Sequence, residues 1–430
     1  MTPGARIAAA IDILATLDEA RRPVADVLKE WGFAHRFAGS KDRSAIAALA
    51  YDALRRKASS AWIMGDPGAR ASVIGALKQS RQMNAEEIAA LFSGEGHAPP
   101  PLMYEERRRL DEATLEGAPD YVRGDYPEWL SSAFTESLGS DAADEGAALA
   151  RRAPVDLRVN GLKGDRAKAL AALSHLNPSE TPFSPWGLRI EIGPDGRGPP
   201  LAAEPAYVKG LVEVQDEGSQ IAALLSGVEA GGQVLDLCAG GGGKSLAFAA
   251  MMKNQGQIYA TDSDGRRLTP IYQRLDRAGA RNVQVRAPKG TQDVLSELIG
   301  RCDIVFVDAP CSGSGAWRRN PDAKWRMRPG ALDQRIKDQK EVFAKASQYV
   351  RKGGRLVYAT CSLFKAENED RVAEFLSARV DFAPIEAAHL ARATGLPELA
   401  PYASKLGAGL RLSPLRTGTD GFYIASLARI

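Results

Sequence analysis

The sequence predicts an α/β protein built around a largely parallel sheet, with a helical region and a small α/β module before that sheet. Three observations support this prediction. Apolar residues recur at helical spacing through residues 1–95, a strand-like alternation begins at Val155, and short apolar strands alternate with helices from Gln233 onward. Strands connected by helices run parallel and are covered on both faces, so the main sheet should lie in the C-terminal half.

Composition places the chain among ordinary globular proteins of two to three domains. The 430 residues are 44% hydrophobic and 25% charged, and a net charge of +3 does not by itself predict a polyanionic partner. Four scattered histidines and four cysteines without a Cys-x-x-Cys pair predict no metal site. Arg6 and Asp12 interrupt any signal peptide, and no uncharged apolar run reaches the roughly 18 residues of a membrane span. We therefore expect a cytoplasmic protein without membrane contact.

The first 150 residues are predicted to be mainly helical. Ile7, Ile11, Leu14 and Leu17 share one helical face, and Asp42 is suited to cap a helix that reaches residue 54. The proline-rich stretch at 94–101 is typical of a linker. Further helices are expected at 24–31, 128–138 and 141–150.

Residues 151–210 are predicted to form the small α/β module. A strand is expected at 155–159, a helix at 167–173 and a second strand at 188–192. The expected domains are therefore 1–150, 151–210 and 211–430.

The C-terminal domain should contain the parallel sheet. Strands are expected at 234–237, 257–261, 283–285, 303–307, 355–359 and 422–427, and helices at 266–279, 293–299 and 332–350. Ligands of such sheets bind at the carboxyl ends of the strands. The residues that carry the chemistry should therefore follow these strands directly.

A glycine-rich loop follows the first strand of this sheet and opens a helix. Its residues are Cys238, Ala239, Gly240, Gly241, Gly242, Gly243 and Lys244. Glycines let the backbone approach a ligand closely, and the free N–H groups of a helix N-terminus favour a polar or anionic ligand. Asp262 ends the next strand, where an acid can bind ribose hydroxyls.

Several ligands are compatible with a loop of this kind. A phosphate-binding P-loop would need glycine at the position of Cys238, so a nucleoside triphosphate is disfavoured. A dinucleotide fits the glycines loosely, and a methionine-derived nucleoside fits the leading Asp236 and the ribose acid best. A turn without any ligand is the remaining alternative, but four successive glycines cost much chain entropy.

Two cysteine motifs follow later strands of the same sheet. The run Asp308-Ala309-Pro310-Cys311 comes after the strand at 303–307, and Thr360-Cys361-Ser362 comes after the strand at 355–359. Either cysteine alone could be a small packing residue, as we expect for Cys238 and Cys302. Two cysteines at the ligand-binding edge favour a chemical role.

These motifs, in this order, resemble those of the Sun/RsmB-type family of RNA cytosine-5 methyltransferases, relatives of the nucleolar and NSUN enzymes. The resemblance covers about residues 214–430 and includes Gln215–Ser219, Asn320–Trp325, Glu367–Glu369 and Asp420–Tyr423. More faintly, Asp42–Arg56 resembles a NusB-like RNA-binding domain. Residues 151–210, with Leu157–Asn160, resemble an RRM-like module.

The resemblance implies a Rossmann-like methyltransferase that binds S-adenosylmethionine and acts on RNA, with ribosomal RNA as the family-level expectation. We expect the protein to be a monomer. The resemblance also implies that Cys361 is the nucleophile, that Cys311 assists product release and that Asp308 contacts the N3 edge of cytosine near the cofactor. Residues Cys238 to Lys244 would cradle the cofactor, Asp262 would bind its ribose, and Arg267 matches a common family arginine.

The chemistry explains the need for these groups. Carbon 5 of cytosine is a poor nucleophile, and addition of a thiolate to C6 makes the ring reactive at C5. An acid near N3 supports the developing charge, and nearby positive charge lowers the pKa of the attacking thiol. The target base must also leave its stack.

Two departures from the family pattern keep other functions open. Gly240-Gly241 stands where the family usually has Ala-Pro, and Ala287-Pro288 stands where a Gly-Asp pair usually contacts the adenine. A catalytically weak relative that acts as an RNA-binding or assembly factor is therefore one alternative. Independently of these departures, a DNA cytosine methyltransferase would use similar covalent chemistry with Cys311 as the attacking residue, but the Thr-Cys-Ser motif and the RNA-type N-terminal modules argue against it.

A basic and aromatic segment lies between the two cysteine motifs. Cations neutralise phosphates and aromatic rings stack on unpaired bases, which predicts RNA contacts. The residues predicted to make them are Trp317, Arg318, Arg319, Lys324, Trp325 and Arg326. The alternative is a solvated loop whose tryptophans anchor it to the core. The other basic cluster, Arg107–Arg109, is flanked by acids and is predicted to be a solvated helix face.

Overall fold

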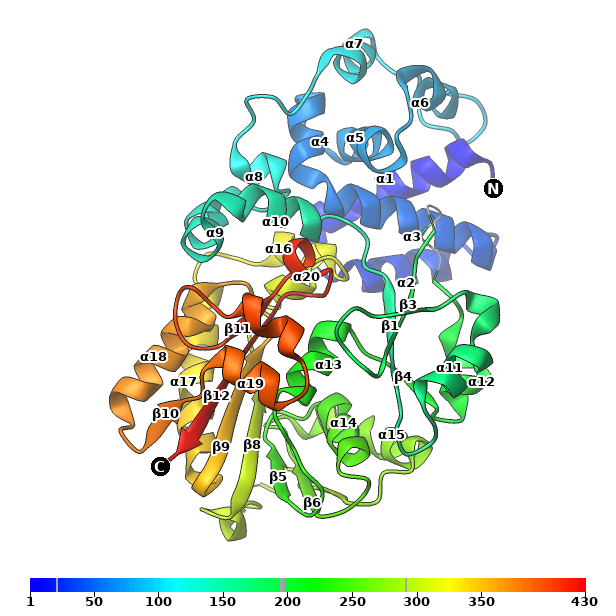
Figure 1. Ribbon diagram of the computed structural model, residues 1–430. Helices are drawn as coiled ribbons and strands as arrows, with labels where there is room; N and C mark the ends of the chain where they lie inside the picture. The colour runs from blue at the N-terminus through cyan, green and yellow to red at the C-terminus, as the bar shows by residue number, and fades with distance from the viewer. Residues whose placement is uncertain (21, 194–195, 197, 291) are drawn as a thin grey trace. The chain divides into compact units, whose positions relative to one another are not determined.

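A computed structural model of the protein describes residues 1–20, 22–193, 196, 198–290 and 292–430 (Figure 1). The chain forms two compact units. The first contains Met1–Ala153, Ile192–Gly198 and Ala316–Pro329, and the second contains Pro154–Glu191, Pro199–Gly315 and Gly330–Ile430. Among the described residues, no helix is both long enough and apolar enough to cross a membrane.

The first unit is helical, as the apolar periodicity predicts. Its helices are α1 (Pro3–Ala20), α2 (Val24–Ala34), α3 (Ser40–Arg55), α4 (Lys57–Met64), α5 (Ala69–Arg81), α6 (Ala85–Leu91), α7 (Tyr104–Glu112), α8 (Asp120–Arg123), α9 (Ser131–Leu138), α10 (Ala142–Leu149) and α16 (Pro321–Arg326). Ile13, Ile46, Ile74 and Phe92 are buried in its core. In α7, Arg108 pairs with Glu105 and Glu112, which confirms the predicted solvated helix face.

A small antiparallel sheet opens the second unit. Its strands are β1 (Val155–Val159), β2 (Ser179–Glu180), β3 (Gly187–Ile190) and β4 (Val212–Val214), in the order β2-β3-β1-β4, with α11 (Arg166–Ala172) and α12 (Pro205–Val208). The two predicted strands and the helix are confirmed. The sequence pattern missed β2 and β4 because strands of two or three residues are too short to show an alternation. Since β4 pairs with β1, this sheet extends past residue 210.

Within the residues that the structure describes, the main sheet has eight strands, and five of them are parallel neighbours. The order is β10-β12-β9-β8-β5-β6-β7, with β11 paired to β12. The strands are β5 (Gln233–Asp236), β6 (Gln257–Ala260), β7 (Val283–Val285), β8 (Cys302–Asp308), β9 (Val350–Thr360), β10 (Phe382–Pro384), β11 (Leu410–Leu412) and β12 (Phe422–Arg429). All the strands predicted for this domain are present, while β10 and β11 were missed.

Helices flank this sheet. They are α13 (Glu217–Leu224), α14 (Gly243–Met251), α15 (Ile271–Ala278), α17 (Ala331–Tyr349), α18 (Glu369–Ala378) and α19 (Ala387–Ala393). The short helix α20 (Pro414–Thr417) lies between β11 and β12 in the chain. The predicted helix at 293–299 is wrong, because only a 3-10 turn forms at Ser296–Leu298. There the Asp293 side chain accepts from the Leu295 N–H and Gly300 follows directly, so the segment ends as a turn.

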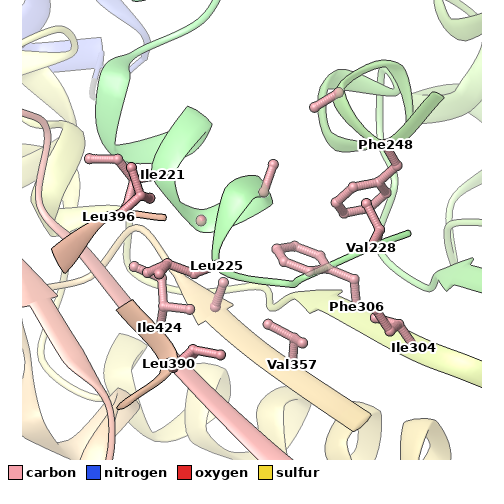
Figure 2. Close-up of a cluster of buried hydrophobic side chains, with 14 of the residues drawn as sticks. Ile221, Leu225, Val228, Phe248, Ile304, Phe306, Val357, Leu390, Leu396 and Ile424 are labelled. Atoms are coloured by element: carbon pink, nitrogen blue, oxygen red, sulfur yellow. The ribbon is translucent and has the colours of Figure 1, made fainter. Parts of the chain in front are cut away.

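The central strands β8 and β9 are buried on both faces. Ile304, Phe306 and Val357 pack on one side with Phe248 and with Ile221 from α13, as Figure 2 shows. The alternate residues of the same strands, including Val305, Val307, Leu356 and Tyr358, belong to a second buried cluster. Burial on both faces explains why these strands are continuous apolar runs.

Candidate active site

The predicted site residues meet at one edge of the main sheet. The parallel pairing sets Asp236 beside Phe306 and Asp308 beside Ala359, so the carboxyl ends of β5, β8 and β9 are adjacent. The glycine loop, Asp262, Asp308, Cys311 and Cys361 therefore all follow strands that end together.

The two cysteines of the edge are in contact. The Sγ atoms of Cys311 and Cys361 lie 3.4 Å apart. The hydrogen bond to Cys361, together with burial, raises the pKa of the Cys311 thiol well above its ordinary value. Cys311 therefore keeps its proton at neutral pH and can donate it toward the sulfur of Cys361.

One buried carboxylate holds both cysteine loops. Glu367 is fully buried and accepts hydrogen bonds from the Ser312 backbone N–H at 2.7 Å and from the Ser312 hydroxyl. It also accepts from the hydroxyl of Ser362, the residue after Cys361. Gln339 of α17 donates to Glu367 at 3.1 Å and to the carbonyl of Pro310 at 3.0 Å. The spacing of the two cysteines thus depends on Glu367.

Backbone contacts tighten the same region. The Gly315 N–H donates to the Cys361 carbonyl at 2.9 Å, and the Gly421 N–H donates to the Gly315 carbonyl at 3.0 Å. A Cβ atom on Gly315 would lie 2.1 Å from the Gly421 carbonyl oxygen. Asn368 donates to the Ser362 carbonyl at 2.9 Å. No role was predicted for Glu367 and Asn368, although two polar residues shortly after the Thr-Cys-Ser motif indicate a contact with that loop.

Asp308 is paired with a lysine from the glycine loop. The Lys244 ammonium lies 2.9 Å from the Asp308 carboxylate and 2.8 Å from the Ser219 hydroxyl. The Lys244 side chain is 5% exposed, whereas that of Asp308 is 32% exposed. The Lys244 ammonium therefore pairs with the Asp308 carboxylate from its buried side, and the exposed side of that carboxylate stays open for a ligand.

The backbone conformation of the glycine loop requires glycine at some positions, and two arginines hydrogen-bond to the carbonyl groups of the loop. Gly240 and Gly242 have φ of +50° and +80°, and a Cβ on Gly242 would lie 2.4 Å from Ile271. Arg274 of α15 donates to the Gly241 carbonyl at 2.6 Å, and Arg158 of β1 donates to the Gly243 carbonyl at 2.9 Å. Neither arginine was assigned to the site from the sequence.

Asp262 closes the other end of the loop. Its buried carboxylate accepts from the Gly240 N–H at 3.1 Å and pairs with Arg267 at 3.2 Å. Arg267 is 58% exposed, so it can turn away when a ligand approaches Asp262. Burial raises the pKa of the Cys238 thiol, which marks this loop cysteine as an unreactive packing residue.

These groups fit S-adenosylmethionine. A Cβ on Gly240 would meet nothing closer than 3.6 Å, so the loop has an open side, with Asp262 beside it to accept ribose hydroxyls. Lys244 and Asp308 stand at the opposite end of the loop. After β7, Ala287 packs against an apolar cluster that includes Leu268 and Ile271, so the wall at this position is apolar.

The structure corrects part of the predicted RNA contact. Trp317 and Lys324 are each 1% exposed and Arg318 is 5% exposed, so none of the three is available to a base or phosphate. Lys324 donates to the carbonyls of Arg55 and Asp125, and the Trp325 indole N–H donates to the Leu54 carbonyl at 2.7 Å.

These residues instead anchor the segment 316–329 within the helical unit. The large aromatic surfaces gain more from burial there than from exposure to solvent. Arg326 remains exposed, though paired with Asp322 at 2.9 Å, and Arg319 is half-buried. RNA contact by these two stays a prediction.

Comparison with known proteins agrees with this geometry. A family model described as 16S rRNA methyltransferase RsmB/F matches residues 223–428, and a ferredoxin-like domain of RsmF/B-like methyltransferases matches residues 126–195. The probable ribosomal RNA small subunit methyltransferase B of Synechocystis sp. is 31% identical over 71% of this chain and 67% of its own length.

Solved structures share the fold. The crystal structure of PH0851 has a TM-score of 0.73 and 25% identity, and the match covers 100% of this chain and 99% of that one. NSun6 from Pyrococcus horikoshii has a TM-score of 0.59 and 21% identity, and the match covers 70% of this chain and 98% of NSun6. With its Rossmann-like sheet, glycine loop and paired cysteine motifs, the chain belongs to the RsmB/F family of S-adenosylmethionine-dependent methyltransferases.

Proposed function

We propose that this protein methylates carbon 5 of a cytosine in ribosomal RNA of the small subunit, through a covalent bond between Cys361 and carbon 6 of the base. The substrate follows from the names of the relatives. The observation that carries the chemistry is the pair of thiols 3.4 Å apart, at the sheet edge that also holds Asp308.

The two thiols suit different roles. The raised pKa of Cys311 keeps it protonated, so Cys361 is the better candidate for the thiolate that attacks C6. A hydrogen bond from the Cys311 thiol would stabilise that thiolate. The alternative is the arrangement of DNA methyltransferases, in which Cys311 would attack.

The proposed reaction divides one hard step into easier ones. The Cys361 sulfur bonds to C6, and the electron pair of the C5–C6 double bond becomes available at C5. N3 takes up a proton as the sulfur adds, and the Asp308 carboxylate, held by Lys244, would accept a hydrogen bond from that N3–H. S-adenosylmethionine supplies the methyl group. A base then removes the C5 proton, the C5–C6 double bond re-forms, N3 gives up its proton, and Cys361 leaves as a thiolate that again accepts a hydrogen bond from the Cys311 thiol.

The test is methyl transfer by the full chain with labelled S-adenosylmethionine and unmodified small-subunit ribosomal RNA. We expect Cys361→Ala to lose 5-methylcytidine formation and Cys311→Ala to accumulate a covalent protein–RNA adduct. Cys302→Ala, which removes a buried thiol at the N-terminal end of β8, opposite the end that carries the site, is the matched control and should stay active. Activity in Cys361→Ala together with none in Cys311→Ala would reverse the assignment.

A second candidate function is an RNA-binding or assembly factor with weak catalysis. The apolar Ala287 at the end of β7, where the family usually has an acid, favours this alternative. Calorimetric titration with S-adenosylmethionine separates the two functions. Binding supports the enzyme, whereas absence of both binding and methylation supports the assembly factor.

A further inference from the structure

The first unit contains a cavity of about 690 Å³ with an unusual lining. Arg55 of α3, the adjacent Arg56, Arg81 at the end of α5, and Arg151 and Arg152 after α10 all contribute to its wall. Among the described residues that line it, Asp52 is the one carboxylate. Arg56 also pairs with Asp125 at 3.4 Å. Five arginines thus face two carboxylates in the described part of the chain, which leaves the cavity positive.

Asp52 cannot neutralise the cavity, because several arginines share it. Arg152 binds its carboxylate through two nitrogens, at 3.0 and 2.6 Å, and holds it most closely. Arg81 reaches it at 3.5 Å and Arg55 only at 3.8 Å. Burial lowers the pKa of Arg55 to about 10, which still leaves its guanidinium charged at neutral pH.

The arginines also have unused hydrogen-bonding capacity. The Nε atoms of Arg55, Arg56 and Arg81 are buried without a hydrogen-bond partner in the part of the chain that the structure describes. The Arg55 residue as a whole is 9% exposed. Buried donors without acceptors are uncommon in native proteins, and a ligand with several acceptor oxygens could engage these guanidinium groups.

A second cavity of the same unit provides an internal comparison. It has a volume of about 370 Å³ and is also lined by basic residues, including Arg22, Lys57 and Arg326. Each of these has a carboxylate of its own: Glu30 at 2.6 Å, Asp18 at 2.5 Å and Asp322 at 2.9 Å, respectively. Its charges are therefore largely compensated, and the excess positive charge belongs to the larger cavity.

We propose that this arginine-lined cavity binds a backbone phosphate of the RNA substrate. The inference rests on the proposed function for the identity of the polyanion, while the lining itself selects phosphate chemistry. Guanidinium groups bind phosphate oxygens in a bidentate manner, and the volume admits a phosphate together with its ribose. Such a contact would position the RNA without reading its sequence.

The test uses the full chain with Arg81→Gln and Arg151→Glu, singly and combined. Arg81 makes only the long contact to Asp52, and Arg151 is exposed, so Asp52 keeps its closest partner, Arg152, in both variants. Arg108→Gln and Arg108→Glu in α7 repeat the charge changes on an exposed arginine outside the cavity. Equal melting temperatures would establish that the variants fold.

The measurement is the affinity for a fluorescent small-subunit ribosomal RNA fragment at several salt concentrations. We expect the double variant to bind about tenfold more weakly, with the slope of log affinity against log salt reduced by about 0.7 per lost contact. The Arg108 variants should bind like the wild type. Unchanged affinity and slope in the double variant would overturn the proposal.

Two further readouts separate the possible failures. Titration with inorganic phosphate shows whether the cavity binds small anions. If Arg81→Gln abolishes phosphate binding but leaves the RNA affinity unchanged, the assignment of the site to RNA is overturned. RNA binding is measured without methyl transfer. If RNA binding depends on these arginines but the protein does not methylate, only the proposed function is refuted. If the protein methylates and the double variant binds RNA as the wild type does, only the phosphate site in the cavity is refuted.

Discussion

At the scale of single residues, the active site depends on a group that does not itself touch the reacting atoms. Glu367 accepts from Ser312 on one cysteine loop and from Ser362 on the other. Ser312 follows Cys311 and Ser362 follows Cys361, so the carboxylate sets the 3.4 Å separation of the two sulfurs. It is a positioning residue for both thiols.

We expect Glu367→Gln to slow methyl transfer while S-adenosylmethionine binding stays unchanged. The amide has the same shape but loses one charged acceptor, and a hydrogen bond to a charged group is worth about 2 kcal/mol, or roughly 30-fold in rate. Rapid-quench measurement of the covalent RNA adduct checks this. Glu374→Gln, an exposed residue of α18 paired with Lys340, is the control. An unchanged rate of adduct formation in Glu367→Gln would contradict the positioning role.

At the scale of elements, the glycine loop is held by strands and helices around it. Glu213 of β4 holds Arg274 at 2.8 Å, and Arg274 in turn donates to the Gly241 carbonyl. Arg158 of β1 reaches the Gly243 carbonyl directly. The small antiparallel sheet thus supplies part of the rigidity that the usual Ala-Pro would give at Gly240-Gly241.

Arg158→Met and Arg274→Met should therefore weaken S-adenosylmethionine binding, each by about fivefold to tenfold, because a loop with four glycines must be ordered without a carbonyl restraint. Calorimetry measures the affinity, and thermal melting checks the fold. Arg266→Met is the matched control, since Arg266 is 91% exposed and pairs with Asp264. Equal affinity in all three variants would mean that the loop is rigid without these arginines.

At the scale of the whole molecule, local patterns predicted the elements better than the contacts between them. The parallel strands, and therefore the shared edge of Asp262, Asp308 and Cys361, followed from alternation of strand and helix. The contact of Arg158 with Gly243 spans 85 residues, and no local pattern reports it. A tryptophan such as Trp317 has the same sequence signature whether it stacks on RNA or anchors a core, and only its burial decides.

The segment Ala316–Pro329 belongs to a different unit from the residues before and after it in the sequence. In sequence it lies between the two cysteine motifs, yet it belongs to the helical unit. Lys324 fixes it there by donating to the carbonyls of Arg55 and Asp125. The charged groups that act on Lys324 are Asp125, Arg55 and Arg56, and burial lowers the Lys324 pKa from 10.5 to about 7.

This shift predicts a pH dependence of stability. The unfolded chain keeps the Lys324 proton up to about pH 10.5, whereas the folded protein releases it near pH 7, so the unfolded state binds more protons between these values. Wild-type stability should therefore rise with pH across that window relative to Lys324→Met, by at most about 1.4 kcal/mol per pH unit. Urea unfolding at pH 7 and pH 9 measures the difference. Lys340→Met, which changes a half-exposed lysine of α17, is the control and should show no such trend. If the difference in unfolding free energy between wild type and Lys324→Met is the same at both pH values, the buried lysine does not titrate in this range.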